Sequence, residues 1–133
     1  PPTAQTLRLP GSVLIFTAIA DAALHAPLRA TGAEIVVIPR AEQGLNLHAV
    51  MAELTRRECN EIHVECGPTL AGALLQAGLL DELVAYMAPV LLGDKARGLF
   101  ELPELRRMSE RTALEVVETR TVGKDWRLTL RLR

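Results

Sequence analysis

The chain has 133 residues, of which 49% are hydrophobic and 3% aromatic, and its formal net charge is −1 at pH 7. This length is enough for one domain, and so high an apolar content excludes a disordered chain. A charge so close to zero argues against broad electrostatic binding to nucleic acid or to membranes, and the apolar stretches are too short to span a bilayer. We therefore expect a single domain over residues 1–133, with a core built from Leu, Val, Ile and Ala.

The first third of the chain predicts strands and a weak helix. After an irregular lead-in over residues 1–10, the apolar runs 13–18 and 34–38 are typical of strands buried on both faces. Between them, residues 21–31 predict a weak helix or a loop, because Pro27 lies inside this stretch.

A second helix is predicted from Leu47 to about Glu58, with Asn46 as its N-cap. Arg56 and Arg57 lie near its end, where cations suit the helix dipole, and we assign no site to them.

Residues 61–78 predict a strand, a tight turn and a third helix. Ile62 and Val64 are β-branched and two apart, as a strand prefers, and Gly67-Pro68 then stops the strand. Either Thr69 caps the helix or Pro68 opens it at the first position, and Gly78 can close it in a left-handed turn.

The rest of the chain predicts three strands and a loop. Residues 82–89 form a strand, and 90–103 form a loop that carries the cations Lys95 and Arg97. Residues 114–122 and 126–132 form a hairpin around the turn 123–125, and the alternation in its second strand predicts one face in water.

The strand–turn–helix unit is the main candidate for a site. Ligands of α/β sheets bind beyond the carboxyl ends of strands, and helix N-termini attract phosphate. Glu65 is therefore a strand-end carboxylate beside a phosphate cradle, and Gly72 serves a close approach that a side chain would block. The alternative remains open that Glu65 is merely solvated and that Gly72 allows a helix to pack on the sheet. No general nucleotide motif such as GxGxxG or GxxxxGK[ST] is present.

Other chemistries find little support. His25, His48 and His63 are not spaced as metal ligands, so we expect no metal site, and the alternation around His63 favours a hydrogen-bonded interior histidine. The motifs H-x-E and P-C-x-x-C of zinc deaminases are absent. Cys59 and Cys66 form no CxxC motif, which favours free thiols in a reducing cytoplasm.

The segment VECGPTLAGALLQAGLLDEL, residues 64–83, resembles the signature of the riboflavin-biosynthesis reductase domain. That domain is the C-terminal part of the bifunctional deaminase-reductase usually called RibD. The similarity continues through residues 88–100 and runs more weakly to the C-terminus. The resemblance implies an α/β fold with a dihydrofolate-reductase-like sheet flanked by helices.

The resemblance also implies a function. Members of the family use NADPH to reduce 5-amino-6-(5-phosphoribosylamino)uracil, a small phosphoribosylaminopyrimidine. Glu65 matches the family's substrate-binding glutamate. The turn that binds the NADPH phosphates corresponds to Gly67, Pro68, Thr69, Leu70, Ala71, Gly72 and Ala73. No side chain presents itself as a catalytic acid, since hydride transfer is largely the cofactor's chemistry.

A family reductase domain is longer than this chain. We therefore expect residues 1–133 to be its C-terminal portion, with the N-terminal strands missing, and the isolated chain to be an inactive homodimer. Two questions stay open: whether the missing N-terminal part exists in the native protein, and whether a deaminase domain precedes it. One alternative is a non-catalytic, self-associating module, which an exposed sheet edge would favour. A weaker alternative is the reduction of a folate or pterin.

Overall fold

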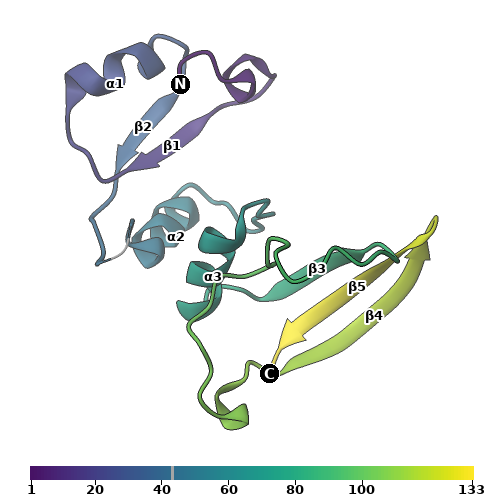
Figure 1. The fold of residues 1–133 in the computed structure, drawn as a ribbon. Helices are drawn as coiled ribbons and strands as arrows, with labels where there is room; N and C mark the ends of the chain where they lie inside the picture. The colour runs from purple at the N-terminus through teal and green to yellow at the C-terminus, as the bar shows by residue number, and fades with distance from the viewer. Residues whose placement is uncertain (43) are drawn as a thin grey trace. The chain divides into compact units, whose positions relative to one another are not determined.

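The computed structural model describes residues 1–42 and 44–133, which form two compact units, Pro1–Ile62 and His63–Arg133. The elements of both units are drawn in Figure 1. They include helices and both parallel and antiparallel strand pairs, so the predicted α/β class is confirmed.

The first unit is built on two parallel strands. β1 (Leu14–Thr17) pairs with β2 (Glu34–Val37), with Leu14 opposite Glu34 and Thr17 opposite Val37. Both strands were expected to be buried, but β1 is half-buried along its length and both ends of β2 are exposed. Each strand has a single strand neighbour within the described part of the chain, so both are edges, which explains their exposure.

The stretch between these strands forms a helix rather than a loop. α1 (Ala22–Arg29) begins at Asp21, whose carboxylate accepts hydrogen bonds from the N–H groups of Ala23 (2.9 Å) and Leu24 (3.3 Å). This cap satisfies N–H groups that a helix start leaves free, and the helix forms although Pro27 inside it has no N–H to donate. The lead-in is also more ordered than expected, with a 3₁₀ turn at Gln5–Arg8.

α2 (Leu47–Arg56) begins as predicted and ends earlier. The side chain of Asn46 accepts a hydrogen bond from the N–H of Ala49 at 3.0 Å, which confirms its role as the N-cap. The helix was expected to reach about Glu58, but Glu58 takes a left-handed conformation with φ 63°. Its N–H donates to the carbonyl of Thr55, and the N–H of Cys59 donates to that of Leu54. This pair of bonds is a Schellman motif, which stops a helix.

A chain of ion pairs ties the end of α2 to β2. Arg57 binds Glu34 through both terminal nitrogens and binds Glu53 at 2.7 Å, while Arg56 binds Glu53 at 2.7 and 2.8 Å. The hydrogen bonds from Arg56 and Arg57 lower the pKa of Glu53 to about 2. Arg57 likewise lowers the pKa of Glu34. Of the two arginines that the sequence related only to the helix dipole, Arg57 therefore connects the helix to a strand, while Arg56 binds within its own helix.

The second unit contains one helix and an antiparallel sheet. The helix α3 (Pro68–Gln76) precedes β3 (Glu82–Met87), β4 (Leu114–Val122) and β5 (Asp125–Leu132). The sheet has the order β3-β5-β4, and the three strands lie side by side in Figure 1. A 3₁₀ turn at Met108–Glu110 lies between β3 and β4.

The predicted hairpin is confirmed, with a shorter turn. Asp125 pairs with Val122 and so belongs to β5, which leaves Gly123 and Lys124 as the turn. One irregularity interrupts the ladder: Val116 pairs with Leu130 and Glu118 with Thr129, so Val117 is an extra residue in β4.

The register gives the sheet one apolar and one charged face, because side chains of paired residues share a face. The mainly apolar face carries Leu83, Ala85, Met87, Leu114, Val116, Trp126, Leu128, Leu130 and Leu132, together with Thr119 and Thr121. The charged face carries Glu82, Glu115, Glu118, Arg120, Arg127 and Arg131. The alternation of apolar and polar residues predicted for the last strand is therefore confirmed. The prediction that one face meets water is not, because Thr129 on the charged face is buried and Trp126 on the apolar face is exposed.

The core is small in both units. In the described residues, the buried hydrophobic side chains are Ala33, Ile38, Val50 and Leu74. Trp126, which the register places on the apolar face, is 40% exposed. Among the same residues, no helix is long and apolar enough to cross a membrane.

Candidate functional site

The candidate site begins at the first turn of α3. Gly67 is the N-cap and Pro68 occupies the first helical position, so the second of the two predicted starts is confirmed. Pro68 is tolerated there because the first N–H groups of a helix have no intrahelical acceptor. The first intrahelical bond runs from the N–H of Ala71 to the carbonyl of Gly67. The N–H groups of Thr69 and Leu70 precede that bond and therefore remain available for an anion at the helix start.

The other end of α3 closes as predicted. Gly78 has φ +66°, and its N–H donates to the carbonyl of Leu75 at 3.1 Å. The N–H of Leu79 donates to the carbonyl of Leu74 at 3.0 Å. These two bonds complete a Schellman motif at a residue whose left-handed backbone suits glycine.

Residues 61–65 do not form the predicted strand. No strand is found between Cys59 and Gly67, and Ile62 and Val64 are 43% and 42% exposed. A strand needs a neighbour to accept and donate its backbone hydrogen bonds. None of the described residues supplies one to residues 60–66, so β-branched residues alone do not make a strand here.

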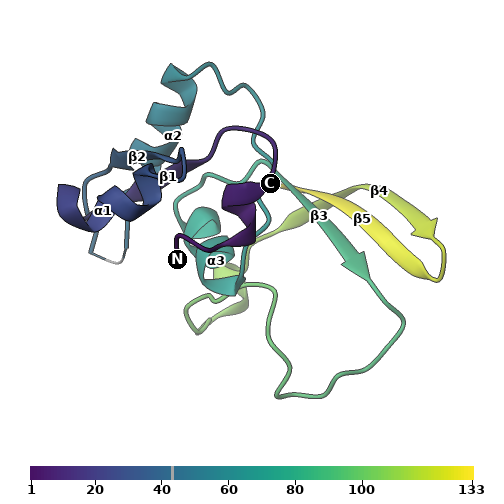
Figure 2. The same ribbon diagram turned by 90° about the horizontal axis from the view of Figure 1, so that it is seen from above.

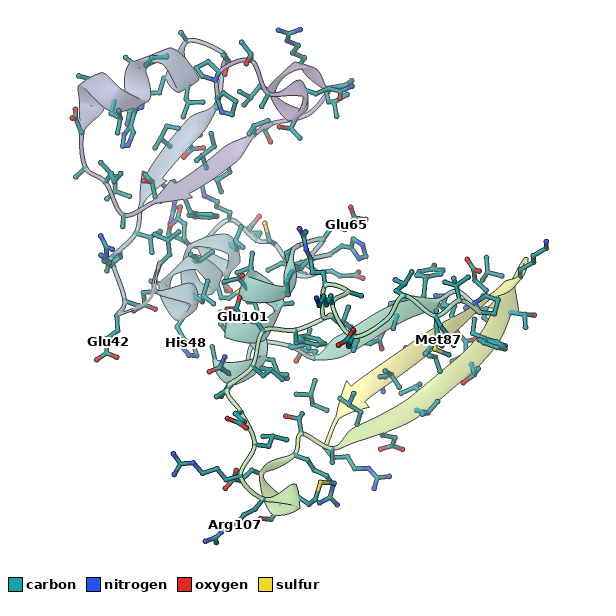
Figure 3. All side chains as sticks on the ribbon, in the orientation of Figure 1. Glu42, His48, Glu65, Met87, Glu101 and Arg107 are labelled. Atoms are coloured by element: carbon teal, nitrogen blue, oxygen red, sulfur yellow. The ribbon has the colours of Figure 1, made fainter. Side chains whose placement is uncertain are left out.

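Glu65 consequently lies in an extended segment just before α3, where Figure 3 labels it. Its side chain is 88% exposed, so its carboxylate is accessible but is not held at the end of a strand.

His63 was expected to be an interior residue, and this prediction is wrong. Its side chain is 79% exposed, and its Nε2 lies 3.5 Å from Oε1 of Glu65. The alternation of polar and apolar residues had suggested a buried face, but without a pairing strand neither side of the segment is covered.

The segment after β3 returns to the first turn of α3. Figure 2 shows the chain leaving the end of β3, arching outward and coming back to the helix. The N–H of Glu101 donates to the carbonyl of Pro68 at 3.0 Å, and Oε2 of Glu101 accepts a hydrogen bond from the Thr69 hydroxyl at 2.7 Å. Thr69 therefore binds this segment instead of capping its own helix.

Gly72 makes this contact possible. A β-carbon at Gly72 would lie 2.0 Å from the carbonyl oxygen of Glu101, far inside van der Waals contact. The structure thus supports the packing alternative for Gly72. The difference is that Gly72 packs against the segment around Glu101, here called the returning segment, rather than against a sheet.

Glu101 is the residue of this site that sequence reasoning missed. It lies 32 residues from Thr69, inside a stretch expected to be a loop, and no local pattern marks a contact over that distance. Lys95 and Arg97 of the same loop are exposed. Among residues 1–42 and 44–133 there is no group of His, Cys, Asp or Glu that could hold a metal ion.

Comparison with known proteins places these features in a family. The family described as the RibD C-terminal domain matches residues 1–128. The riboflavin biosynthesis protein RibD of Escherichia coli is 49% identical over 90 residues, which are 68% of this chain and 24% of that protein. A protein of Buchnera aphidicola named 5-amino-6-(5-phosphoribosylamino)uracil reductase is 35% identical over 86 residues, 65% of this chain and 42% of that protein. The chain thus spans less than half the length of these relatives.

Solved structures agree with the sequence relatives. RibD of Acinetobacter baumannii, in its form 2, matches with a TM-score of 0.84 and 27% identity, over 100% of this chain and 34% of that one. A pyrimidine reductase-like protein of Corynebacterium diphtheriae shares the fold at a TM-score of 0.71 and 19% identity, over 90% of this chain and 50% of that one. This chain therefore belongs to the family of RibD C-terminal domains.

Proposed function

We propose that this chain is part of an NADPH-dependent reductase of riboflavin biosynthesis, acting on 5-amino-6-(5-phosphoribosylamino)uracil. The observation that carries the proposal is the family match over residues 1–128, together with the reductase activity for which the Buchnera relative is named. The residues matched include residues 67–73, here called the α3 turn, which are the part of the chain best suited to an anionic ligand.

In this proposal the α3 turn holds the phosphate groups of the cofactor. Residues 67–73 offer the N–H groups of Thr69 and Leu70 and the positive end of the helix dipole, with no carboxylate of their own. Thr69 is the only residue of this turn with a side-chain hydrogen-bond donor. NADPH would supply the hydride, while the chain would bind and orient the cofactor.

Glu65 has the role of holding the substrate. Its exposed carboxylate lies two residues before Gly67, so a group bound by it would sit near the α3 turn. An aminouracil presents N–H groups, and a carboxylate accepts hydrogen bonds from them. A charged acceptor strengthens such bonds relative to a neutral one.

We also propose that the chain forms a homodimer through the apolar face of its sheet. Met87, Val116 and Trp126 on that face are 48%, 59% and 40% exposed. Exposed apolar patches of this kind mark protein interfaces, and a second copy would bury them symmetrically. The cytoplasm remains the proposed location, in line with the free thiols of Cys59 and Cys66.

Calorimetric titration of the purified chain with NADPH, with NADH as the comparison, tests the proposed function. We expect saturable binding of NADPH, and we expect turnover only when the rest of a reductase domain is supplied. Absence of NADPH binding would contradict the proposal. The exposed apolar face supports a second candidate, a non-catalytic self-associating module. A dimer in light scattering without NADPH binding would favour that candidate.

A further inference from the structure

Glu101 touches the proposed cofactor turn in three ways. Its N–H donates to the carbonyl of Pro68 at 3.0 Å, and its carbonyl oxygen fills the space beside Gly72. These backbone contacts fix where residue 101 lies. Its carboxylate then accepts the hydrogen bond of the Thr69 hydroxyl at 2.7 Å. Figure 3 labels Glu101 beside α3.

The Thr69 hydroxyl has one proton to donate, and Glu101 uses it. A phosphate group bound at the α3 turn would compete for the same donor, because the neighbouring side chains of residues 67–73 offer no other. The carboxylate also brings a negative charge to the end of the helix where negative charge is favoured. It therefore stabilises the turn without a ligand and opposes the arrival of a second anion.

We propose that Glu101 acts as an internal competitor of the cofactor, lowering the affinity of the α3 turn for phosphate groups. The inference rests on the proposed function, because it needs residues 67–73 to bind the phosphates. On binding, only the carboxylate turns away from Thr69. The backbone contacts at Pro68 and Gly72 do not involve it and remain, so the returning segment stays in place.

Glu101→Gln is the sharpest test, since it removes the charge and keeps the size and the backbone of the residue. We expect the variant to bind NADPH about two- to fivefold more tightly, the range typical of one charge at a helix end. The gain should shrink at high salt, because exposed charges are screened. Glu101→Thr, which replaces the long side chain by a short uncharged one and so also removes the amide oxygen that glutamine would keep, should show the same direction.

Glu104→Gln is the matched control, because Glu104 is exposed in the same segment and the variant makes the same change of net charge. Titration calorimetry with NADPH, and with inorganic pyrophosphate as a simpler anion, gives the dissociation constants of all four proteins. Circular dichroism confirms that each is folded.

The outcomes separate the two proposals. Tighter binding by both Glu101 variants and unchanged binding by Glu104→Gln would support the inference. If wild type binds NADPH and the Glu101 variants bind equally well, or if Glu104→Gln gains as much, the inference is wrong and the proposed function stands. If none of the four proteins, wild type included, binds either NADPH or pyrophosphate, both proposals are wrong.

Discussion

The carbonyl oxygen of Glu101 occupies the space that a side chain at Gly72 would need. The distance from that oxygen to a β-carbon at residue 72 would be 2.0 Å, and the obstacle is backbone, which cannot simply rotate away. A substitution at Gly72 therefore acts first on the returning segment and only through it on the α3 turn.

Gly72→Ala should destabilise the chain, although alanine is favoured over glycine inside a helix by about 1 kcal/mol. The methyl group must push Glu101 away, which breaks its bonds to Pro68 and Thr69. We expect a lower melting temperature and faster hydrogen exchange of the Glu101 amide. Gly98→Ala is the control, because the nearest atom to its β-carbon would be a tolerable 3.5 Å away. Equal melting temperatures for wild type and Gly72→Ala would show that the contact between Gly72 and Glu101 does not contribute to stability.

The proposed dimer can be tested with two neighbouring residues of β3. Met87 lies on the apolar face and Tyr86 on the charged face, and both are exposed. Met87→Lys should give a monomer in light scattering, because a buried lysine would lose its hydration. Tyr86→Lys should leave the dimer intact. Dissociation by both variants, or by neither, would move the interface away from the apolar face.

The ion pairs of Glu53 should make stability depend on pH in acid. The folded chain holds the pKa of Glu53 at about 2, below the 4.5 of an unpaired glutamate. The unfolded state therefore takes up the proton first, so the stabilisation is full above pH 4.5 and is lost as the pH falls toward 2.

Urea unfolding of wild type and Glu53→Gln should show this as a difference in unfolding free energy that is constant near neutral pH and shrinks between pH 4.5 and 2. Glu61→Gln, at an exposed residue, provides the control. A difference that did not change with pH would mean that the network contributes packing rather than charge.

Glu58→Gly should stabilise the first unit. Glu58 has φ 63°, a left-handed conformation that costs a residue with a β-carbon roughly 1–2 kcal/mol. Glycine avoids this cost but loses more backbone entropy on folding, so we expect a net gain of up to about 1 kcal/mol. Thermal unfolding measures it, with Glu61→Gly as the control that should bring no gain. A lower melting temperature for Glu58→Gly would indicate that the glutamate side chain makes a contribution of its own.

Glu65→Gln separates substrate binding from cofactor binding. If Glu65 accepts hydrogen bonds from substrate N–H groups, loss of its charge weakens them by roughly 1 kcal/mol or more. In an active reductase containing this chain, kcat/KM for the aminouracil should fall severalfold, while the Kd of NADPH stays the same. The reverse pattern would assign Glu65 to the cofactor.

Local signals in the sequence were sufficient where local interactions decide the structure. Asn46 and Gly78 mark helix ends through bonds to their own helices, and Gly123 lies at a hairpin turn. The strand over residues 62–64 failed because a strand is completed by its neighbour, which composition does not reveal. Glu101 was missed for a related reason, since its role follows from a contact across the fold.

The extra residue in β4 settles more than the local register. Before Val117, the apolar positions of β4 are Leu114 and Val116, and after it the ladder resumes with Glu118 on the opposite face. Without this bulge, a strict alternation would place Glu118 opposite Leu128 and Arg120 opposite Trp126. Glu118 would then lose its 2.8 Å bond to Arg127, one of the two arginines that hold its pKa down. A single inserted residue thus keeps the ionic side chains of β4 together with Arg127 and away from the leucines of β5.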